Sequence, residues 1–410
     1  MSERIELDEL RAAVLARRAP LPAITIAPRD ALGFVLASPV NATESIPSFE
    51  NSAMDGYALR SADTPSDGAL LKMVGSTMAG EPPGKLGPGE AIRIMTGAPM
   101  PFGADAVCIQ EEAVEDGRGG VVIPRAIAAG RNVRLPGEDI LAGSEVFAAG
   151  TELRAAHLGV LAAIGERTVI VHRQPVVGVL STGDELVGDG APLGEGKIRD
   201  ANRPALLALV AAIGARAVDL GIVGDDSSEL LGVLERATAS CDAVVVSGGA
   251  SNGDRDPIAH VLEKMAGSSQ VRSFDAAIRP AKPFVFGEVG ERCTPIFGLP
   301  GNPVSALVAF ELLAKPAIRR LAGHHGAATP TLRGVADADF TRRQDGKVHY
   351  VRATTSADEA GILHVRPAEG QGAHMLLALA NSNSLVVLED GDGALEGDTV
   401  NVLLLSLDSL

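Results

Sequence analysis

Apolar residues change their spacing several times along the chain, and each change marks a predicted structural boundary. Residues 5–17 carry an apolar stripe at helical spacing, and a second helix is predicted over residues 28–37, with Pro28 in its first turn. From about residue 56 to 145, glycine and proline separate short apolar runs, which is typical of a β-rich domain. Helical spacing returns at Thr151. The β-rich block is therefore predicted to be inserted into a helical region.

Residues 175–322 alternate short apolar runs with helical stripes, which predicts βαβ units and a parallel sheet. The runs at 176–180 and 243–246 are short and β-branched, as in strands buried on both faces. After residue 323 the pattern is again β-like. The predicted fold is multidomain α/β plus β. Its predicted domains are a discontinuous helical and linker domain (1–50 and 145–174), an inserted β-rich domain (51–144), a central parallel α/β domain (175–325) and a C-terminal small β-barrel domain (326–410).

Composition and charge exclude several kinds of partner. Aromatic residues make up only 3% of the chain and tryptophan is absent, which argues against stacking of nucleic-acid bases. The net charge of −16 argues against a polyanion-binding surface and against attraction to an anionic membrane. No apolar run approaches the roughly 20 residues of a membrane helix, and the start does not read as a signal peptide. Three widely spaced cysteines suit a reducing cytoplasm.

Three predicted strand ends carry similar groups of hydroxyl, glycine and acidic residues. In chain order they are Ser181, Thr182, Gly183, Asp184 and Glu185, then Ser247, Gly248 and Gly249 with Asp254 and Asp256 beyond them, then Pro300, Gly301, Asn302 and Pro303. Carboxyl ends of parallel strands share one sheet edge, so these turns are expected to converge. Glycine N–H groups suit a phosphate, and the acids suit a divalent cation. A single turn of this kind is more often structural, but three at one edge favour a ligand site.

Two further features bear on anion binding. Standard nucleotide motifs are absent, because Ala191 stands where a P-loop before Lys197 needs its first glycine and no GxGxxG follows a strand. Arg279 and Lys282 lie in the proline-stiffened segment RPAKP, just before a predicted strand. These two residues either bind an anion at a fixed position or form a solvated surface pair, and both interpretations remain open.

Eight separated motifs together resemble the MoeA family, the molybdopterin molybdenumtransferases, which the C-terminal domain of gephyrin also represents. They are NSAMDGYA (51–58), GSTMAGEPP (75–83), IMTGAPMPFGADAV (94–107), NVRLPGEDI (132–140), STGDEL (181–186), SGGAS (247–251), RPAKPFVFG (279–287) and GLPGNPVSA (298–306). They follow the family order and cover nearly the whole chain. The SGG and PGNP turns also resemble the molybdopterin-binding domain of MogA and MoaB proteins.

The resemblance implies an activity and a set of site residues. It implies that molybdate is inserted into adenylylated molybdopterin with release of AMP, with Mg²⁺ as cofactor, by a homodimer whose active site is shared between subunits. Implied catalytic residues are Asp55, Asp139, Glu185 and Asp242, and implied metal ligands are Asp55, Glu185, Asp225 and Asp256. Thr96, Arg279, Lys282 and the three strand-end turns would bind substrate. Contact with the molybdopterin adenylyltransferase is a further expectation.

Two other functions stay open at this point. One is a molybdopterin adenylyltransferase of the MogA kind, although the N-terminal motifs argue against it. The other is a non-catalytic molybdopterin-binding scaffold. The sequence departs from the family pattern at Arg199, Gly224 and Asn252, which puts the details of ligand fit in question.

Overall fold

The computed structural model describes residues 3–64, 69–188, 190–250, 257–266, 271–326 and 329–406. The chain forms two compact units. The large unit comprises residues 1–24, 33–37 and 171–410, and the small unit comprises residues 25–32 and 38–170. Two of the unit boundaries fall inside β2 (Ala23–Ile26) and β13 (Val169–His172).

A seven-stranded sheet forms the centre of the large unit, in the order β1-β19-β21-β22-β18-β14-β17. Its strands are β1 (Glu3–Ile5), β14 (Val176–Thr182), β17 (Arg216–Val223), β18 (Ala243–Ala250), β19 (Val271–Ala276), β21 (Pro283–Val289) and β22 (Thr294–Pro300). Neighbours β22, β18, β14 and β17 are parallel, as the alternating pattern predicts. By contrast, β21 runs antiparallel to β22. Only residues 290–293 join these two strands, and so short a connection cannot return the chain for a parallel pairing.

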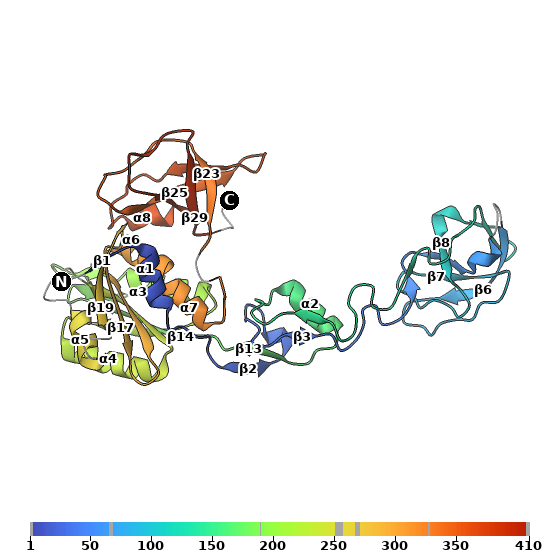
Figure 1. Cartoon of the computed structure of the whole chain (residues 1–410), viewed down its shortest axis with the longest axis horizontal. Helices are drawn as coiled ribbons and strands as arrows, with labels where there is room; N and C mark the ends of the chain where they lie inside the picture. The colour runs from blue at the N-terminus through green and yellow to red at the C-terminus, as the bar shows by residue number, and fades with distance from the viewer. Residues whose placement is uncertain are drawn as a thin grey trace. The chain divides into compact units, whose positions relative to one another are not determined.

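Helices cover both faces of this sheet (Figure 1). They are α1 (Leu7–Leu15), α3 (Asn202–Ala212), α4 (Ser227–Ser240), α5 (Pro257–Ala266), α6 (Pro303–Ala309), a π-helical turn (Phe310–Ala314) and α7 (Lys315–Leu321). Side chains alternate along β18, so Val245 packs with α1, α3 and α6, whereas Val244 packs with α4 and α5. Burial on both faces explains why residues 243–246 of the strand are all apolar.

The C-terminal part of the large unit is a closed barrel, which confirms the small β-barrel prediction. Strands β25, β26, β23, β29 and β27 pair in sequence, and a further pairing of β25 with β27 closes the ring. Bounds in this part are β20 (Ile278–Arg279), β23 (Thr331–Ala336), β24 (Phe340–Thr341), β25 (Val348–Ala357), β26 (Leu363–Pro367), α8 (Leu376–Ala380), β27 (Ser384–Leu388), β28 (Gly393–Ala394) and β29 (Thr399–Leu404). β20 pairs with β25, which places Arg279 opposite His349.

The small unit is rich in β structure, as the spacing of its glycines and prolines predicts. Its six-stranded sheet runs β8 (Ala106–Ile109), β5 (Gly56–Leu59), β7 (Glu90–Ile94), β6 (Ala69–Thr77), β10 (Gly120–Ile123) and β9 (Val114–Glu115). Two strand pairs lie outside this sheet, β3 (Val40–Asn41) with β12 (Glu145–Phe147) and β4 (Asn51–Ser52) with β11 (Val133–Arg134). The unit also contains the helix α2 (Ala155–Ala163) and the 3-10 turns η1 (Pro28–Asp30), η2 (Ser61–Asp63) and η3 (Gln110–Glu112).

Two sequence-based helix predictions need correction. The helix predicted over 28–37 is wrong, because only the turn η1 forms there. Gly33 has a φ of +79°, outside the helical region, and Leu36 is extended and bridges Val171. The helix predicted from Thr151 begins instead at Ala155.

Candidate functional site

The three strand-end turns do meet at one edge of the large sheet. Ser181 at the end of β14 lies opposite Ser247 of β18, and Ser247 lies opposite Leu299 of β22. Gly248 must be glycine at this edge, since its φ is +92° and a Cβ there would stand 2.1 Å from the carbonyl oxygen of Thr182. The backbone of this turn therefore packs directly against the neighbouring one.

Asn202 connects these turns, although the sequence analysis did not place it in the site. Its Nδ2 donates to Ser247 Oγ at 2.7 Å and to the carbonyl oxygen of Gly301 at 2.8 Å. Next to it, Ser181 Oγ donates to Asp200 Oδ1 at 3.0 Å. The only sequence signal was the polar segment 197–202 immediately before a predicted helix. Asn202 and Asp200 thus fix the relative positions of the turns.

Carboxylates gather where β14 and β17 end. Asp184 Oδ1 accepts a hydrogen bond from the amide of Asp225 at 3.0 Å, and a Cβ at Gly224 would stand 2.6 Å from the same oxygen. A Cβ at position 224 would therefore have to displace the Asp184 side chain. Glu185 folds back over Gly183, where a Cβ would lie 2.5 Å from its Oε2. Asp184, Glu185 and Asp225 are all exposed.

Of the four predicted metal ligands, Glu185 and Asp225 belong to this set of carboxylates. Across the described ranges, no group of three or more His, Cys, Asp or Glu side chains is arranged to hold a metal ion. Asp254 and Asp256, as well as Asn252, lie outside the described residues. Mg²⁺ commonly uses only one or two protein carboxylates and takes its other ligands from water and phosphate oxygens. Glu185 and Asp225 are therefore a donor set of the right chemistry for a phosphate-bound Mg²⁺.

Arg199 has a local role in the structure. It lies in β16 (Ile198–Arg199), which pairs with β15 (Leu186–Val187). Its guanidinium donates to the carbonyl oxygen of Ala191 at 3.0 Å. This departure from the family pattern therefore closes a surface loop.

Asp242 does not lie with the other predicted site residues. It precedes the first residue of β18, at the opposite end of the strand from Gly248. Arg173 donates to both of its carboxylate oxygens, at 2.5 and 2.6 Å, and the amide of Val176 donates at 2.9 Å. These contacts account for its burial, with only 6% of the side chain exposed. The catalytic role of Asp242 stays a prediction.

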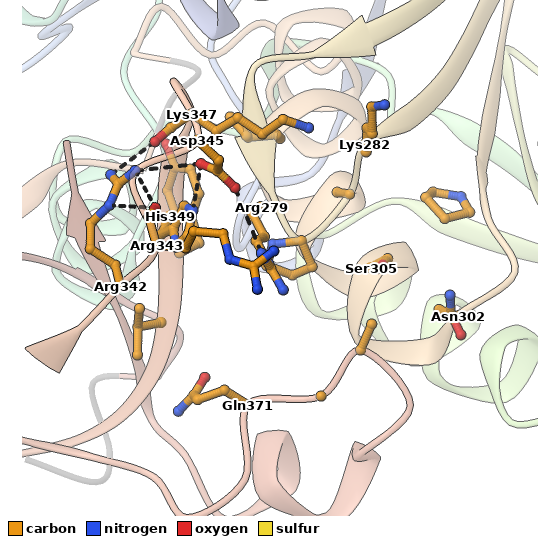
Figure 2. Close-up of a pocket in the computed structure, with 18 of the residues that line it drawn as sticks. Arg279, Lys282, Asn302, Ser305, Arg342, Arg343, Asp345, Lys347, His349 and Gln371 are labelled. Carbon is orange, nitrogen blue, oxygen red and sulfur yellow. Dashed lines mark hydrogen bonds and ion pairs between the residues drawn. The ribbon is translucent and has the colours of Figure 1, made fainter. Parts of the chain in front are cut away.

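A cavity of about 720 Å³ lies within the large unit, between the strand-end turns and the barrel (Figure 2). It is lined by residues 278–283, 300–302 and 371–373, by Ser305, and by residues of the segment 341–351. The lining includes five cationic side chains, Arg279, Lys282, Arg342, Arg343 and Lys347, but only one carboxylate, Asp345. We call this the basic cavity. It concentrates positive charge in a chain whose net charge is −16.

Two acids hold some of these cations. Asp345 lies 3.6 Å from Arg279 Nη1 and 3.4 Å from Arg342 Nη2, and Asp275 lies 2.8 Å from Lys282 Nζ. Burial raises the pKa of Asp345, but the hydrogen bond from His349 and the nearby positive charges outweigh it, so the net shift of this pKa is downward. Burial lowers the pKa of Lys347. Arg279 and Lys282 thus each pair with an acid, although their side chains are 58% and 43% exposed.

The small unit brings two of its motifs together. The amide and the hydroxyl of Thr96 both donate to Asp55 Oδ1. Together they lower the pKa of Asp55, with the backbone bond making the larger contribution. Asp139 is exposed, and its amide donates to the carbonyl oxygen of Ile46 at 3.0 Å. Thus Asp55 is held as a charged, oriented carboxylate on a turn.

Comparison with known families and structures gives consistent matches along the chain. Residues 5–165 match the MoeA N-terminal region (domain I and II), residues 178–320 match a probable molybdopterin binding domain, and residues 333–405 match the MoeA C-terminal region (domain IV). No helix of the described residues has the length and apolar character needed to cross a membrane.

Individual relatives match nearly end to end. The molybdopterin molybdenumtransferase of Haemophilus influenzae is 36% identical over 402 residues, which cover 97% of this chain and 98% of that protein. The protein of the same name from Nostoc sp. is 37% identical, with 88% of this chain and 83% of that protein covered. The crystal structure of the molybdopterin biosynthesis MoeA protein from Pyrococcus horikosii aligns with a TM-score of 0.80 at 30% identity, covering 98% of this chain and 100% of that one. The chain therefore belongs to the MoeA family.

Proposed function

We propose that this chain inserts molybdate into adenylylated molybdopterin, which yields molybdenum cofactor and AMP. Its membership of the MoeA family makes it a transferase of molybdenum cofactor biosynthesis, since its curated relatives are named molybdopterin molybdenumtransferase. The proposal concerns the form of the pterin substrate, the oxyanion and the residues that bind them.

The observation that carries the proposal is the contact between the strand-end turns and the basic cavity. Pro300, Gly301 and Asn302 belong to the PGNP turn and also line the cavity. A phosphate-bearing pterin bound along the turns would thus place its reactive end beside five cations. Such a cluster attracts a dianion such as molybdate, which the chain's overall charge of −16 would otherwise repel.

Within this proposal each group of residues has a role. Ser181, Thr182, Ser247 and the glycine N–H groups of the turns bind the pterin and its phosphates. Glu185 and Asp225 hold Mg²⁺, which neutralises charge on the anhydride that is broken. Arg279 and Lys282 hold the oxyanion by charge-assisted hydrogen bonds.

Residues of the small unit complete the proposed site. Asp55, oriented by Thr96, and Asp139 would orient the attacking water or oxyanion. In the proposed homodimer, these residues act on substrate that is bound to the large unit of the second copy of the chain. Contact with the molybdopterin adenylyltransferase would deliver the adenylylated pterin. The described cysteines, Cys108, Cys241 and Cys293, are all free, which fits a cytoplasmic enzyme.

One assay separates this function from its alternatives. The purified protein is incubated with adenylylated molybdopterin, Mg²⁺ and molybdate, and both AMP and molybdenum cofactor are quantified. We expect both products, dependent on molybdate. Formation of adenylylated molybdopterin from molybdopterin and ATP would instead identify an adenylyltransferase. Tight binding of the pterin with neither reaction would identify a scaffold. Glu185→Gln should lower the rate and raise the Mg²⁺ concentration needed for half-maximal rate.

A further inference from the structure

His349 is the only histidine among the described residues that line the basic cavity, and the proposed function so far gives it no role. It lies on β25 with 7% of its surface exposed. Its Nε2 lies 3.0 Å from Asp345 Oδ1, and Figure 2 shows the two side chains side by side. Among the residues that the structure describes, no hydrogen-bond partner is found for its Nδ1. One ring nitrogen is therefore anchored by a carboxylate, while the other has no protein partner among the described residues.

Asp345, which anchors the ring, is itself fixed in place. Its carboxylate lies beside Arg342, whose side chain is fully buried and donates to the carbonyl oxygens of Lys347 at 2.9 Å and Leu388 at 3.1 Å. Arg279 approaches the second carboxylate oxygen at 3.6 Å. The imidazole thus has a carboxylate on Nε2 that orients the ring.

Insertion of molybdate requires protons to move from the pterin thiols to an oxygen of molybdate. When the dithiol of the pterin binds molybdenum, two Mo–S bonds form, two S–H bonds break, and one oxygen leaves as water. The two thiol protons balance the departing oxide, the net charge is unchanged, and molybdenum stays Mo(VI). A group beside the oxyanion that can give a proton and then regain one would assist the departure of this oxide.

Histidine is the cavity residue suited to this exchange. The guanidinium groups of Arg279, Arg342 and Arg343 do not give up protons near neutral pH. Lys282 and Lys347 are ion-paired with Asp275, at 2.8 and 3.9 Å, so both ammonium groups already have a carboxylate partner. Neither the first turn of α6 nor the segment 371–373 contributes a titratable side chain to the lining. An imidazole is the side chain that exchanges protons most readily in this pH range.

We propose that His349, oriented by Asp345, is a catalytic proton donor to the leaving oxide of a molybdate bound in the basic cavity. This inference rests on the proposed function. Nδ1 gives its proton to the oxide and takes one back from a thiol of the pterin, so the residue is unchanged after each turnover.

The test uses the full-length protein with adenylylated molybdopterin and molybdate. In His349→Gln, kcat for molybdenum insertion should fall by about 100-fold or more, while KM for molybdate changes by less than about threefold. The wild-type rate should decline toward high pH, where proton donation fails, and this decline should be absent in His349→Gln. In Asp345→Asn kcat should also fall, because the neutral amide holds the imidazole ring less strongly than the carboxylate does. The exposed His325 provides a control, since His325→Gln should keep the wild-type rate and pH profile.

The outcomes are distinguishable. If wild-type protein inserts no molybdenum, the proposed function fails. If wild-type protein is active and His349→Gln keeps its rate and its pH profile, only the role of His349 fails. A variant that loses molybdate binding with unchanged kcat would also overturn proton donation and would make His349 a binding residue. Circular dichroism and thermal unfolding of each variant exclude misfolding as the cause.

Discussion

Thr96 donates two hydrogen bonds to a single oxygen of Asp55, from its backbone amide at 2.7 Å and from its hydroxyl at 2.8 Å. The two residues belong to different motifs and meet because β5, which follows Asp55, pairs with β7, which precedes Thr96. Both bonds require a charged acceptor to be strong, so they keep the carboxylate ionised and fix its direction.

Replacing Thr96 by Val should weaken the role of Asp55 without removing it. The variant keeps the backbone bond and loses the hydroxyl bond, so the pKa of Asp55 should rise toward its usual value. A carboxylate with a lowered pKa acts in its charged form above that pKa. The acid limb of the pH–rate profile should therefore move to higher pH, and turnover should fall about tenfold because the carboxylate is less well oriented. Thr96→Ser keeps the hydroxyl and should retain the wild-type profile; equal loss in both variants would contradict this reading.

Asp242→Asn should affect stability more than turnover. The substitution removes a carboxylate that binds Arg173 through both oxygens, at the sheet edge away from the turns. We expect a loss of about 1–3 kcal/mol in the free energy of unfolding, measured by urea denaturation, with turnover per folded molecule retained. Asp219→Asn is a matched control, because its carboxylate also pairs with an arginine but is half exposed, and should cost less than about 1 kcal/mol. Normal stability with lost turnover would instead establish Asp242 as catalytic.

Gly248→Ala should be much more damaging than Gly214→Ala. Both glycines have a positive φ, +92° and +78°, so both substitutions carry similar backbone strain. At Gly214 an added Cβ meets open space, whereas at Gly248 it meets the Thr182 carbonyl oxygen at 2.1 Å. We expect a loss of about 1–2 kcal/mol at Gly214 and about 2–5 kcal/mol at Gly248. Pterin binding, followed by fluorescence titration, should weaken only in Gly248→Ala; equal effects would mean that the turn adapts.

The barrel carries an ion cluster that should make its stability depend on pH. His364 Nδ1 lies 2.7 Å from Asp337 and its Nε2 lies 3.5 Å from Asp358. The hydrogen bond that His364 donates to Asp337 raises the pKa of His364 above its usual 6.5. The negative charges of Asp337 and Asp358 contribute in the same direction, and desolvation opposes them. A raised pKa in the folded state stabilises the protein fully below the unfolded pKa, and this contribution is lost as pH rises through the folded pKa.

Thermal unfolding of His364→Gln should reveal this contribution. The variant should have a lower Tm than wild type on the acid side of about pH 6.5, and the difference should shrink as the pH rises through the folded pKa. His325→Gln provides the exposed control. A difference in Tm that is independent of pH would show that His364 contributes by packing alone.

Local pattern was sufficient for much of this fold. The β-branched run before Ser247 buries its apolar atoms only as a strand, and the apolar stripe of α4 buries its atoms only as a helix. The alternation of strands and helices therefore follows from the spacing of apolar residues. The convergence of the three turns follows as well, because parallel strands end at the same edge. The antiparallel direction of β21 was not predicted, because a short hairpin leaves little trace in the spacing of apolar residues. The absence of a helix near Pro28 was not predicted either, because the positive φ of Gly33 does not change that spacing.

The sequence by itself determined which residue types are available for chemistry, and the tertiary structure decided which of them act together. Its glycines, acids and cations are the components of an anion site, and their motifs carry the resemblance to the MoeA family. Only the fold made Asn202 the link between two turns and set His349 beside Asp345 on the wall of the basic cavity. These contacts depend on strand direction, on register and on the pairing of β20 with β25. Such pairings join residues far apart in the chain, and no local pattern records them.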